Sequence, residues 1–172
     1  MPITIRPETL QDYKIIYQLN KQAFERDNEA KLVNNLRESS SFIPDLSLVA
    51  ELENQIIGHI LFVKIQIKNS SQETESLALA PMAVHPDFQK KGFGGRLILE
   101  GLKRIAALGF KSVIVLGHEH YYPKFGFEPA EKWGIKAPIE VPSEVFMALE
   151  LVPDGLNGVS GVVEYPKEFE KV

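Results

Sequence analysis

One stretch, residues 80–97, constrains the fold more strongly than any other part of the sequence. It reads APMAVHPDFQKKGFGGRL, so an apolar run that ends at His85 and Pro86 is followed by a polar, partly basic loop and three glycines. Apolar residues at helical spacing begin directly after the glycines, which predicts a strand, a loop and a glycine-rich helix start. Such a junction directs backbone N–H groups and the positive end of a helix dipole at one point, which suits a phosphate or pyrophosphate group.

The glycine pattern excludes two common nucleotide-binding fingerprints. No stretch matches the P-loop pattern G-x-x-x-x-G-K-[ST]. The dinucleotide fingerprint G-x-G-x-x-G fails because Leu97 stands at the position of the third glycine and no strand directly precedes Gly92. What remains is Gln-x-x-Gly-x-Gly, formed by Gln89, Gly92 and Gly94. Taken alone, this short motif is also compatible with a helix start that binds nothing.

In its setting, the motif resembles the pyrophosphate-binding loop of the GNAT (GCN5-related N-acetyltransferase) superfamily. There, Gln/Arg-x-x-Gly-x-Gly/Ala follows a strand that ends in a V-x-P phrase, which residues 84–86 (VHP) supply here. A second segment, residues 116–127, reads LGHEHYYPKFGF and is similar to the superfamily segment Y-x-x-x-G-F. Its form YYPKFGF resembles the YhbS-like subgroup of acetyltransferases in particular. The resemblance covers about residues 3–152.

The resemblance implies an α/β (α+β) chain with the GNAT fold. That fold is a mixed central β-sheet of about six to seven strands, flanked by helices, with splayed central strands. The length of 172 residues suits one domain with a sizeable core. We therefore expect a single N-acetyltransferase domain over residues 1–172, with a core of about residues 3–152 and a C-terminal extension of residues 153–172.

Hydrophobic periodicity predicts the individual elements. The expected strands span 3–6, 46–52, 56–65, 77–84, 110–117 and 144–151, with an edge strand at 159–163. Three helices are expected. The first begins after a cap at Asp12, the second spans residues 29–39, and the third begins after the glycines and ends near residue 108. We expect a polar loop over residues 68–75. Gly58 should mark a bulge or a close backbone approach, and His59 should lie at the sheet surface.

Charge and composition exclude several classes of protein. The net charge of −4 gives no basic footprint, so no nucleic-acid partner is expected. The absence of cysteine excludes disulfides, thiolate metal sites and a cysteine nucleophile. The N-terminal residues lack a signal-peptide pattern and no apolar run approaches a membrane span, so we expect a cytoplasmic protein with no membrane association. His118 and His120 with Glu119 have no partner pair elsewhere in the sequence at a spacing suited to zinc, so no metal is expected.

The resemblance implies acetyl-CoA as the cosubstrate. Backbone atoms of Met82 and Val84 would pair with its pantetheine arm, and a backbone N–H near Met82 or Ala83 would face the thioester oxygen. Glycine in the loop lets the backbone approach the phosphates, where a Cβ would hold it away. The expected cofactor-binding residues are Met82, Ala83, Val84, Gln89, Lys90, Lys91, Gly92, Phe93, Gly94, Gly95, Arg96 and Tyr122.

The resemblance also implies a catalytic acid, but it leaves the base open. In the superfamily the tyrosine of Y-x-x-x-G-F lies beside the cofactor sulfur, so Tyr122 is expected to protonate the leaving thiolate. Many members carry a glutamate base in the central strand, but residues 77–80 read LALA and contain no carboxylate. His118, Glu119, Glu29 or an ordered water could serve instead.

The expected acceptor is a primary amine of a small molecule or protein, bound by a monomer or a homodimer. Glu25, Asp27 and Glu29 lie in the segment that covers the acceptor site in the superfamily, which favours a cationic acceptor. Each of these acids also fits an ordinary solvated loop or helix cap.

Two other functions remain open from the sequence. A non-catalytic acyl-CoA-binding sensor or regulatory module fits the missing strand carboxylate, and would bind coenzyme A without acetyl transfer. A structural or interaction module without a ligand would use the glycine loop for packing, so Gly94→Glu would leave its function intact. Under the enzyme hypothesis, the same substitution abolishes cofactor binding while the protein stays folded.

Overall fold

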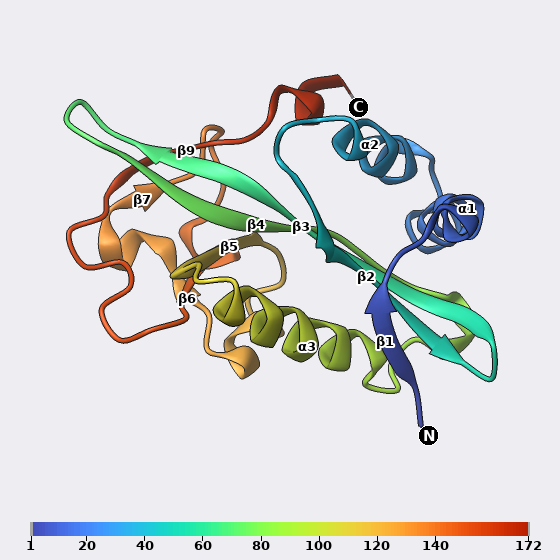
Figure 1. Ribbon diagram of the computed structural model, residues 1–172. Coiled ribbons are helices and arrows are strands. Elements are labelled where there is room, and N and C mark those ends of the chain that lie inside the picture. Colours follow the sequence, from blue (N-terminus) through green and yellow to red (C-terminus); the bar gives the residue numbers. More distant parts are fainter. Residues whose placement is uncertain (1, 172) are drawn as a thin grey trace. The chain divides into compact units, whose positions relative to one another are not determined.

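The fold is built on a mixed β-sheet, which has nine strands in the part of the chain that the computed structural model describes, residues 2–171 (Figure 1). The strand order is β1-β2-β3-β4-β5-β8-β6, and β9 pairs with β3 and β7. This confirms the predicted α/β class with a mixed sheet, although short strands raise the number above six to seven. The chain divides into two compact units, of which the first contains the residues up to Val63, Ala80–Ile105 and the segment from Lys167, and the second contains Lys64–Leu79 and Ala106–Pro166.

The first unit contains the N-terminal strands and the helices. Its elements are β1 (Thr4–Pro7), α1 (Tyr13–Phe24), α2 (Asn28–Arg37), β2 (Phe42–Leu52), the first part of β3 (Gln55–Lys68), the last part of β4 (Glu73–Val84) and nearly all of α3 (Phe93–Ala107). β2 pairs antiparallel with both β1 and β3. Glu53 and Asn54 both have positive φ (50° and 65°), so the β2–β3 hairpin closes through a tight turn between the two predicted strands. No helix within residues 2–171 has both the length and the apolar composition needed to cross a bilayer.

Two glycines set how closely α3 approaches the strands of this unit. A Cβ added at Gly101 would lie 2.4 Å from Cε1 of Phe62 on β3, so a larger side chain would push the helix away. A Cβ at Gly58 would lie 3.0 Å from Cδ1 of Leu97, and the β2–β3 register shifts beside Gly58. This confirms the predicted close approach and bulge at Gly58, and it fixes the first turns of α3 against the sheet.

The second unit contains the other strands. Its elements are the end of β3, the start of β4, β5 (Ser112–Leu116), β6 (Glu128–Pro129), β7 (Ile135–Lys136), β8 (Phe146–Glu150) and β9 (Gly161–Glu164). β5 pairs parallel with β4 through Leu77–Val113 and Ala78–Ile114, as the strand-helix-strand pattern predicts. This ladder of two pairs is shorter than either strand, as splayed central strands require. β8 pairs antiparallel with β5. The strand expected near residues 159–163 is present as β9, but the prediction that it lies at an edge is wrong, because β9 pairs with both β3 and β7.

The predicted polar loop over residues 68–75 is wrong. β3 continues to Lys68 and β4 begins at Glu73, so only a short turn separates the two strands. The side-chain oxygen of Asn69 accepts the backbone N–H of Gln72 (3.0 Å), which closes this turn locally. The polar residues at these strand ends were predicted as a loop, but the outer residues of a hairpin do not need to be apolar.

Asp12 precedes α1 as predicted, but its carboxylate makes no capping hydrogen bond to that helix. It accepts hydrogen bonds from Arg6 (2.7 Å) and from the backbone N–H of Thr9 (2.7 Å). The side chain therefore links β1 to the short turn that leads into α1.

Candidate functional site

One candidate site lies in the first unit and is the loop that joins β4 to α3, whose own hydrogen bonds hold its shape. The backbone N–H of His85 donates to the carbonyl of Ile57 on β3 (2.8 Å), so the strand remains paired up to the V-x-P phrase. A short 3-10 turn, Pro86–Phe88, follows. Nε2 of Gln89 then donates to the carbonyl of Val84 (3.0 Å) and closes the loop. The motif glutamine thus fixes the loop through its side chain.

The helix that follows begins in a geometry suited to an anion. Lys90 and Gly92 have positive φ (64° and 86°), which turns the chain sharply into α3. Phe93 is buried and anchors the first turn in the core. The N–H groups of a first helical turn have no partners within the helix, and Gly94 and Gly95 place no side chain over them. The loop and helix start can therefore accept a phosphate group on backbone donors.

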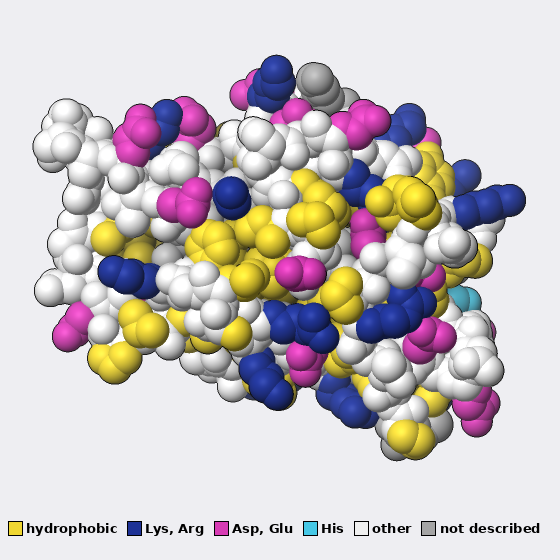
Figure 2. Space-filling view, viewed as in Figure 1, with side chains coloured by type: hydrophobic (Ala, Val, Ile, Leu, Met, Phe, Trp, Pro, Cys, Tyr) yellow, Lys and Arg dark blue, Asp and Glu magenta, His cyan; other side chains and the backbone are white. Residues whose placement is uncertain are grey.

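Basic side chains gather at this loop and helix. Figure 2 shows several Lys and Arg side chains over α3. Lys90, Lys91 and Arg96 are all exposed, and Nζ of Lys91 lies 5.8 Å from the centroid of the Phe88 ring. A chain with a net charge of −4 therefore concentrates positive charge beside the glycine-rich turn.

The last residues of β4 lead directly into this loop. Ala83 is buried, whereas Met82 and Val84 are half-buried and occupy the opposite face of the strand. Backbone contacts of Met82 and Val84 with pantetheine, and the oxyanion donor near Met82 or Ala83, stay predictions.

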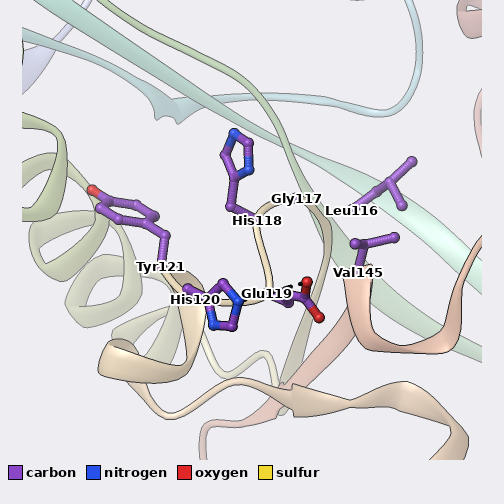
Figure 3. Close-up of a pocket in the computed structure, with 7 residues that line it drawn as sticks. All are labelled: Leu116, Gly117, His118, Glu119, His120, Tyr121 and Val145. Atoms are coloured by element: carbon purple, nitrogen blue, oxygen red, sulfur yellow. Dashed lines mark ion pairs between the residues drawn. The ribbon is translucent and has the colours of Figure 1, made fainter.

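Another candidate site lies in the second unit and is a cavity of about 540 Å³ at the C-terminal end of β5 (Figure 3). Its lining residues are Leu116, Gly117, His118, Glu119, His120, Tyr121 and Val145. The backbone N–H groups of Tyr121 and Tyr122 donate to the carbonyl of His118 (3.1 and 3.3 Å), which makes this segment a tight turn. The N–H of Gly117 donates to the carbonyl of Val145 (2.9 Å) and fixes the base of the turn.

The cavity lining contains one carboxylate, that of Glu119. Its Oε1 lies 3.7 Å from Nε2 of His120, and in Figure 3 these two side chains lie next to each other while His118 points away from them. No cluster of three or more His, Asp or Glu residues that could hold a metal ion occurs within residues 2–171.

Tyr122 packs against the wall of this cavity. A Cβ at Gly117 would lie 2.3 Å from Cε2 of Tyr122, so the ring lies directly on the glycine. The ring also makes edge-on contacts with Tyr121 (centroids 5.1 Å apart) and Phe127 (5.7 Å). Burial, with a smaller effect of Tyr121, raises the pKa of Tyr122 to about 12. The phenol is therefore protonated at neutral pH and can donate a proton. His118 and Tyr122, two of the predicted catalytic residues, thus belong to one turn at one cavity.

Val145 and Tyr121 line the cavity but are not among the site residues predicted from the sequence. Val145 joins the cavity because β5 and β8 are paired, and no local pattern marks such a contact. Tyr121 could have been included, because it follows the strand end within the same turn.

Glu29, the third predicted catalytic residue, lies at the start of α2 and is engaged by a neighbour. Its Oε1 accepts a hydrogen bond from Nε of Arg26 (2.9 Å), and this hydrogen bond lowers the pKa of Glu29. Asp27 forms a similar ion pair with Lys31 (3.1 Å). Two of the three acids expected to attract a cationic acceptor are therefore already paired within their own segment.

The predicted position of His59 at the sheet surface is wrong, because its side chain is fully buried. Nε2 of His59 lies 2.9 Å from Oγ of Ser47, whose hydroxyl donates to Oε1 of Glu8 (2.7 Å). Nε and Nη2 of Arg37 donate to the two oxygens of the same carboxylate (2.8 and 2.9 Å). The single hydroxyl proton of Ser47 is used for Glu8, so His59 carries its proton on Nε2. In a strand that is covered on both faces, polar and apolar side chains are buried alike, so alternation along the strand does not show that the polar residues are exposed.

This Ser–His–Glu grouping contains the residue types of a hydrolase triad but not its geometry. Ser47 is fully buried, and its hydroxyl donates to the carboxylate and not to the imidazole. Burial lowers the pKa of His59, so the ring stays neutral. The cluster therefore connects the segment after β1 with α2, β2 and β3, and it offers no nucleophile.

A mixed sheet with a strand that leads into a glycine-rich helix start is the architecture expected of the GNAT-type acetyltransferases that the sequence resembles. A family model described as "Acetyltransferase (GNAT) domain" matches residues 44–129, which include this strand, the loop, α3 and the turn at Tyr122.

Individual relatives match over most of the chain. The chain is 42% identical over 134 residues to the uncharacterized N-acetyltransferase YjhQ of Escherichia coli, a match that covers 77% of this chain and 74% of YjhQ. It is 34% identical over 168 residues to the uncharacterized N-acetyltransferase YhbS of the same species, covering 97% and 98% of the two chains. The chain therefore belongs to the GNAT family of acetyltransferases, as the resemblance predicts, and it is an acetyltransferase enzyme.

Solved structures agree with this assignment. The crystal structure of E. coli YhbS in complex with CoA matches with a TM-score of 0.90 and 34% identity, covering 98% of this chain and 92% of that one. A GNAT acetyltransferase from Brucella melitensis in complex with acetyl-CoA matches with a TM-score of 0.79 and 32% identity, covering 98% of both chains.

Proposed function

We propose that the protein transfers an acetyl group from acetyl-CoA to a primary amine of a small molecule or a protein, by direct attack in a ternary complex. The observation that carries this proposal is the loop between β4 and α3, where the Gln89 hydrogen bond and two residues with positive φ lead into a glycine-rich helix start in a GNAT chain. The relatives crystallised with CoA and with acetyl-CoA support the choice of cosubstrate.

The loop would bind the pyrophosphate of acetyl-CoA through backbone N–H groups of residues 91–95. Lys90, Lys91 and Arg96 would add positive charge towards the phosphates. Backbone atoms of Met82 and Val84 would pair with the pantetheine arm. Gln89 acts on this site indirectly, because its side chain holds the carbonyl of the last β4 residue.

In the reaction, the amine nitrogen attacks the carbonyl carbon of the thioester, and a C–N bond forms. A backbone N–H near Met82 or Ala83 stabilises the oxyanion of the tetrahedral intermediate. As the C–S bond breaks, Tyr122 donates its phenolic proton to the leaving thiolate, and the amine loses a proton to a base. The products are an amide and coenzyme A.

Two observations support His118 as the base in preference to Glu29. His118 lines the cavity against which the acid Tyr122 packs. The carboxylate of Glu29 is held by Arg26, which lowers its pKa and makes it a weaker base.

Calorimetric titration with acetyl-CoA tests the cosubstrate site, with Gly94→Glu as the disabling variant. The substitution places a side chain and a negative charge at the first turn of α3, so binding should be lost while far-UV circular dichroism stays the same. Leu99→Glu is the matched control, because Leu99 lies on the same helix and is 58% exposed. Equal affinity in the wild type and Gly94→Glu would refute the site.

The alternative function is a sensor that binds acyl-CoA without catalysis. An amine panel with detection of the released thiol separates the two functions. Thiol release that depends on an amine supports the transferase, whereas tight binding with no release from any amine supports the sensor.

A further inference from the structure

We propose that the cavity at the end of β5 selects small amines that carry a second positive charge, and that Glu119 binds this second charge. The inference rests on the proposed acetyl transfer and concerns the acceptor alone.

The size and lining of the cavity favour a small molecule. Its volume of about 540 Å³ lies within the roughly 300–1,000 Å³ typical of small-molecule pockets. Leu116, Val145 and the ring of Tyr121 provide apolar contact, which suits an aliphatic chain. Two imidazoles and one carboxylate provide the polar groups. A short alkyl chain with polar ends fits this combination.

The carboxylate is unsuited to the reacting nitrogen itself. An amine must be neutral to attack the thioester, and a neighbouring carboxylate favours the charged ammonium form. Glu119 would therefore slow the reaction if it held the attacking amine. A group that stays cationic throughout the reaction gains from the same contact.

The arrangement of the turn separates these two roles. His118, the proposed base, points away from Glu119, so the two side chains can contact different parts of one molecule (Figure 3). The reacting amine would lie near His118, and the second cation near Glu119. An acceptor of this kind is a diamine, or an amine that also carries a guanidinium or quaternary ammonium group.

Other groups that can carry a positive charge lie near the cavity. His120 lies 3.7 Å from Glu119 and competes for it only when the imidazole is protonated. Lys124 lies with its Nζ 4.3 Å from the centroid of the Tyr121 ring and is not among the lining residues. Among the residues that line the cavity there is no lysine or arginine to occupy Glu119.

The test compares diaminopentane with pentylamine, which share one chain length and differ in the second charge. We expect the wild type to prefer the diamine in kcat/KM by about tenfold, as one charge-assisted hydrogen bond at a partly exposed site allows. Glu119→Gln should raise the KM for the diamine by about the same factor, with a smaller change in kcat, and bring the ratio close to one. Glu128→Gln is the matched control and should keep the wild-type ratio, because that carboxylate is paired with Lys132 (3.0 Å) and does not line the cavity.

The outcomes separate the inference from the function on which it rests. Equal rates with the two amines, or an unaltered ratio in Glu119→Gln, would overturn the inference while acetyl transfer still stood. Acetylation of a peptide amine but of neither small amine would do the same. Failure of the wild type to bind acetyl-CoA would instead refute the proposed function.

Discussion

Replacing Glu8 with Gln should destabilise the protein strongly at neutral pH and hardly at all in acid. The Glu8 side chain is 4% exposed and that of its partner Arg37 is 7% exposed. Burial alone would raise the pKa of Glu8, but the nearby His59 and the hydrogen bonds from Arg37 and Ser47 outweigh burial and lower it from 4.5 to about 2. At about 1.4 kcal/mol for each unit of pKa, this difference corresponds to about 3 kcal/mol of folding free energy. Removal of one partner from a buried ion pair typically costs about 3–5 kcal/mol.

The sign of the pH dependence follows from the direction of the pKa change. A carboxyl group whose pKa is lower in the folded state contributes its full stabilisation above the unfolded value of 4.5, and this contribution is lost as the pH falls towards 2. Glutamine has the shape of a protonated glutamic acid, so the variant resembles the wild type at low pH. Burial also lowers the pKa of His59, and Glu8 opposes this effect, so acid destabilises the two proteins equally through His59 only once Glu8 is itself protonated.

Urea unfolding followed by far-UV circular dichroism measures the difference. We expect Glu8→Gln to lose about 3 kcal/mol at neutral pH, with a gap that narrows steadily below about pH 4.5. Glu29→Gln is the control, because the partner of that carboxylate, Arg26, is 59% exposed, and such pairs contribute at most about 1 kcal/mol. A loss below about 1 kcal/mol for Glu8→Gln, or a loss that does not vary with pH, would refute the argument.

Two further predictions concern Tyr122 and Gly101. Tyr122→Phe should lower kcat by about tenfold with little change in the KM for acetyl-CoA. This effect is at or below the low end of general-acid effects, because a phenol with a raised pKa is a weak proton donor. Steady-state kinetics tests the prediction, and a kcat equal to that of the wild type would remove the acid role. Gly101→Ala places a Cβ 2.4 Å from Phe62 and should destabilise the protein by about 1–3 kcal/mol. Thermal unfolding measures the loss, and a melting temperature equal to that of the wild type would show that the helix–strand contact relaxes freely.

The loop between β4 and α3 could be predicted because its determinants are local. Gln89 bonds to a carbonyl five residues earlier, and Gly92 adopts a backbone conformation that favours glycine. The same holds for the Glu53–Asn54 turn. Spacing and residue type are sufficient where all the partners lie within one short segment.

The buried cluster around Glu8 could not be predicted, because its partners are distant in the sequence. Arg37 lies 29 residues from Glu8, and Ser47 lies 39 residues away. A lone histidine in an alternating strand gives no indication of whether its face is covered, so the burial of His59 depends on elements that the strand pattern does not report. The cavity beside Tyr122 was predicted only in part for the same reason, because Val145 reaches it through the pairing of β5 with β8.

The burial of β4 explains why a base would come from the turn after β5. Leu77, Ala78 and Leu79 are each at most 5% exposed, so successive side chains on both faces of this part of the strand are covered. A carboxylate among them would lose its hydration without a cationic partner and would become protonated. The turn at His118 carries no such cost, because it borders an open cavity and its backbone is fixed by hydrogen bonds within the turn. A GNAT chain with an apolar strand at this position is thus expected to place its proton acceptor on the turn, where Tyr122 already packs against the same cavity.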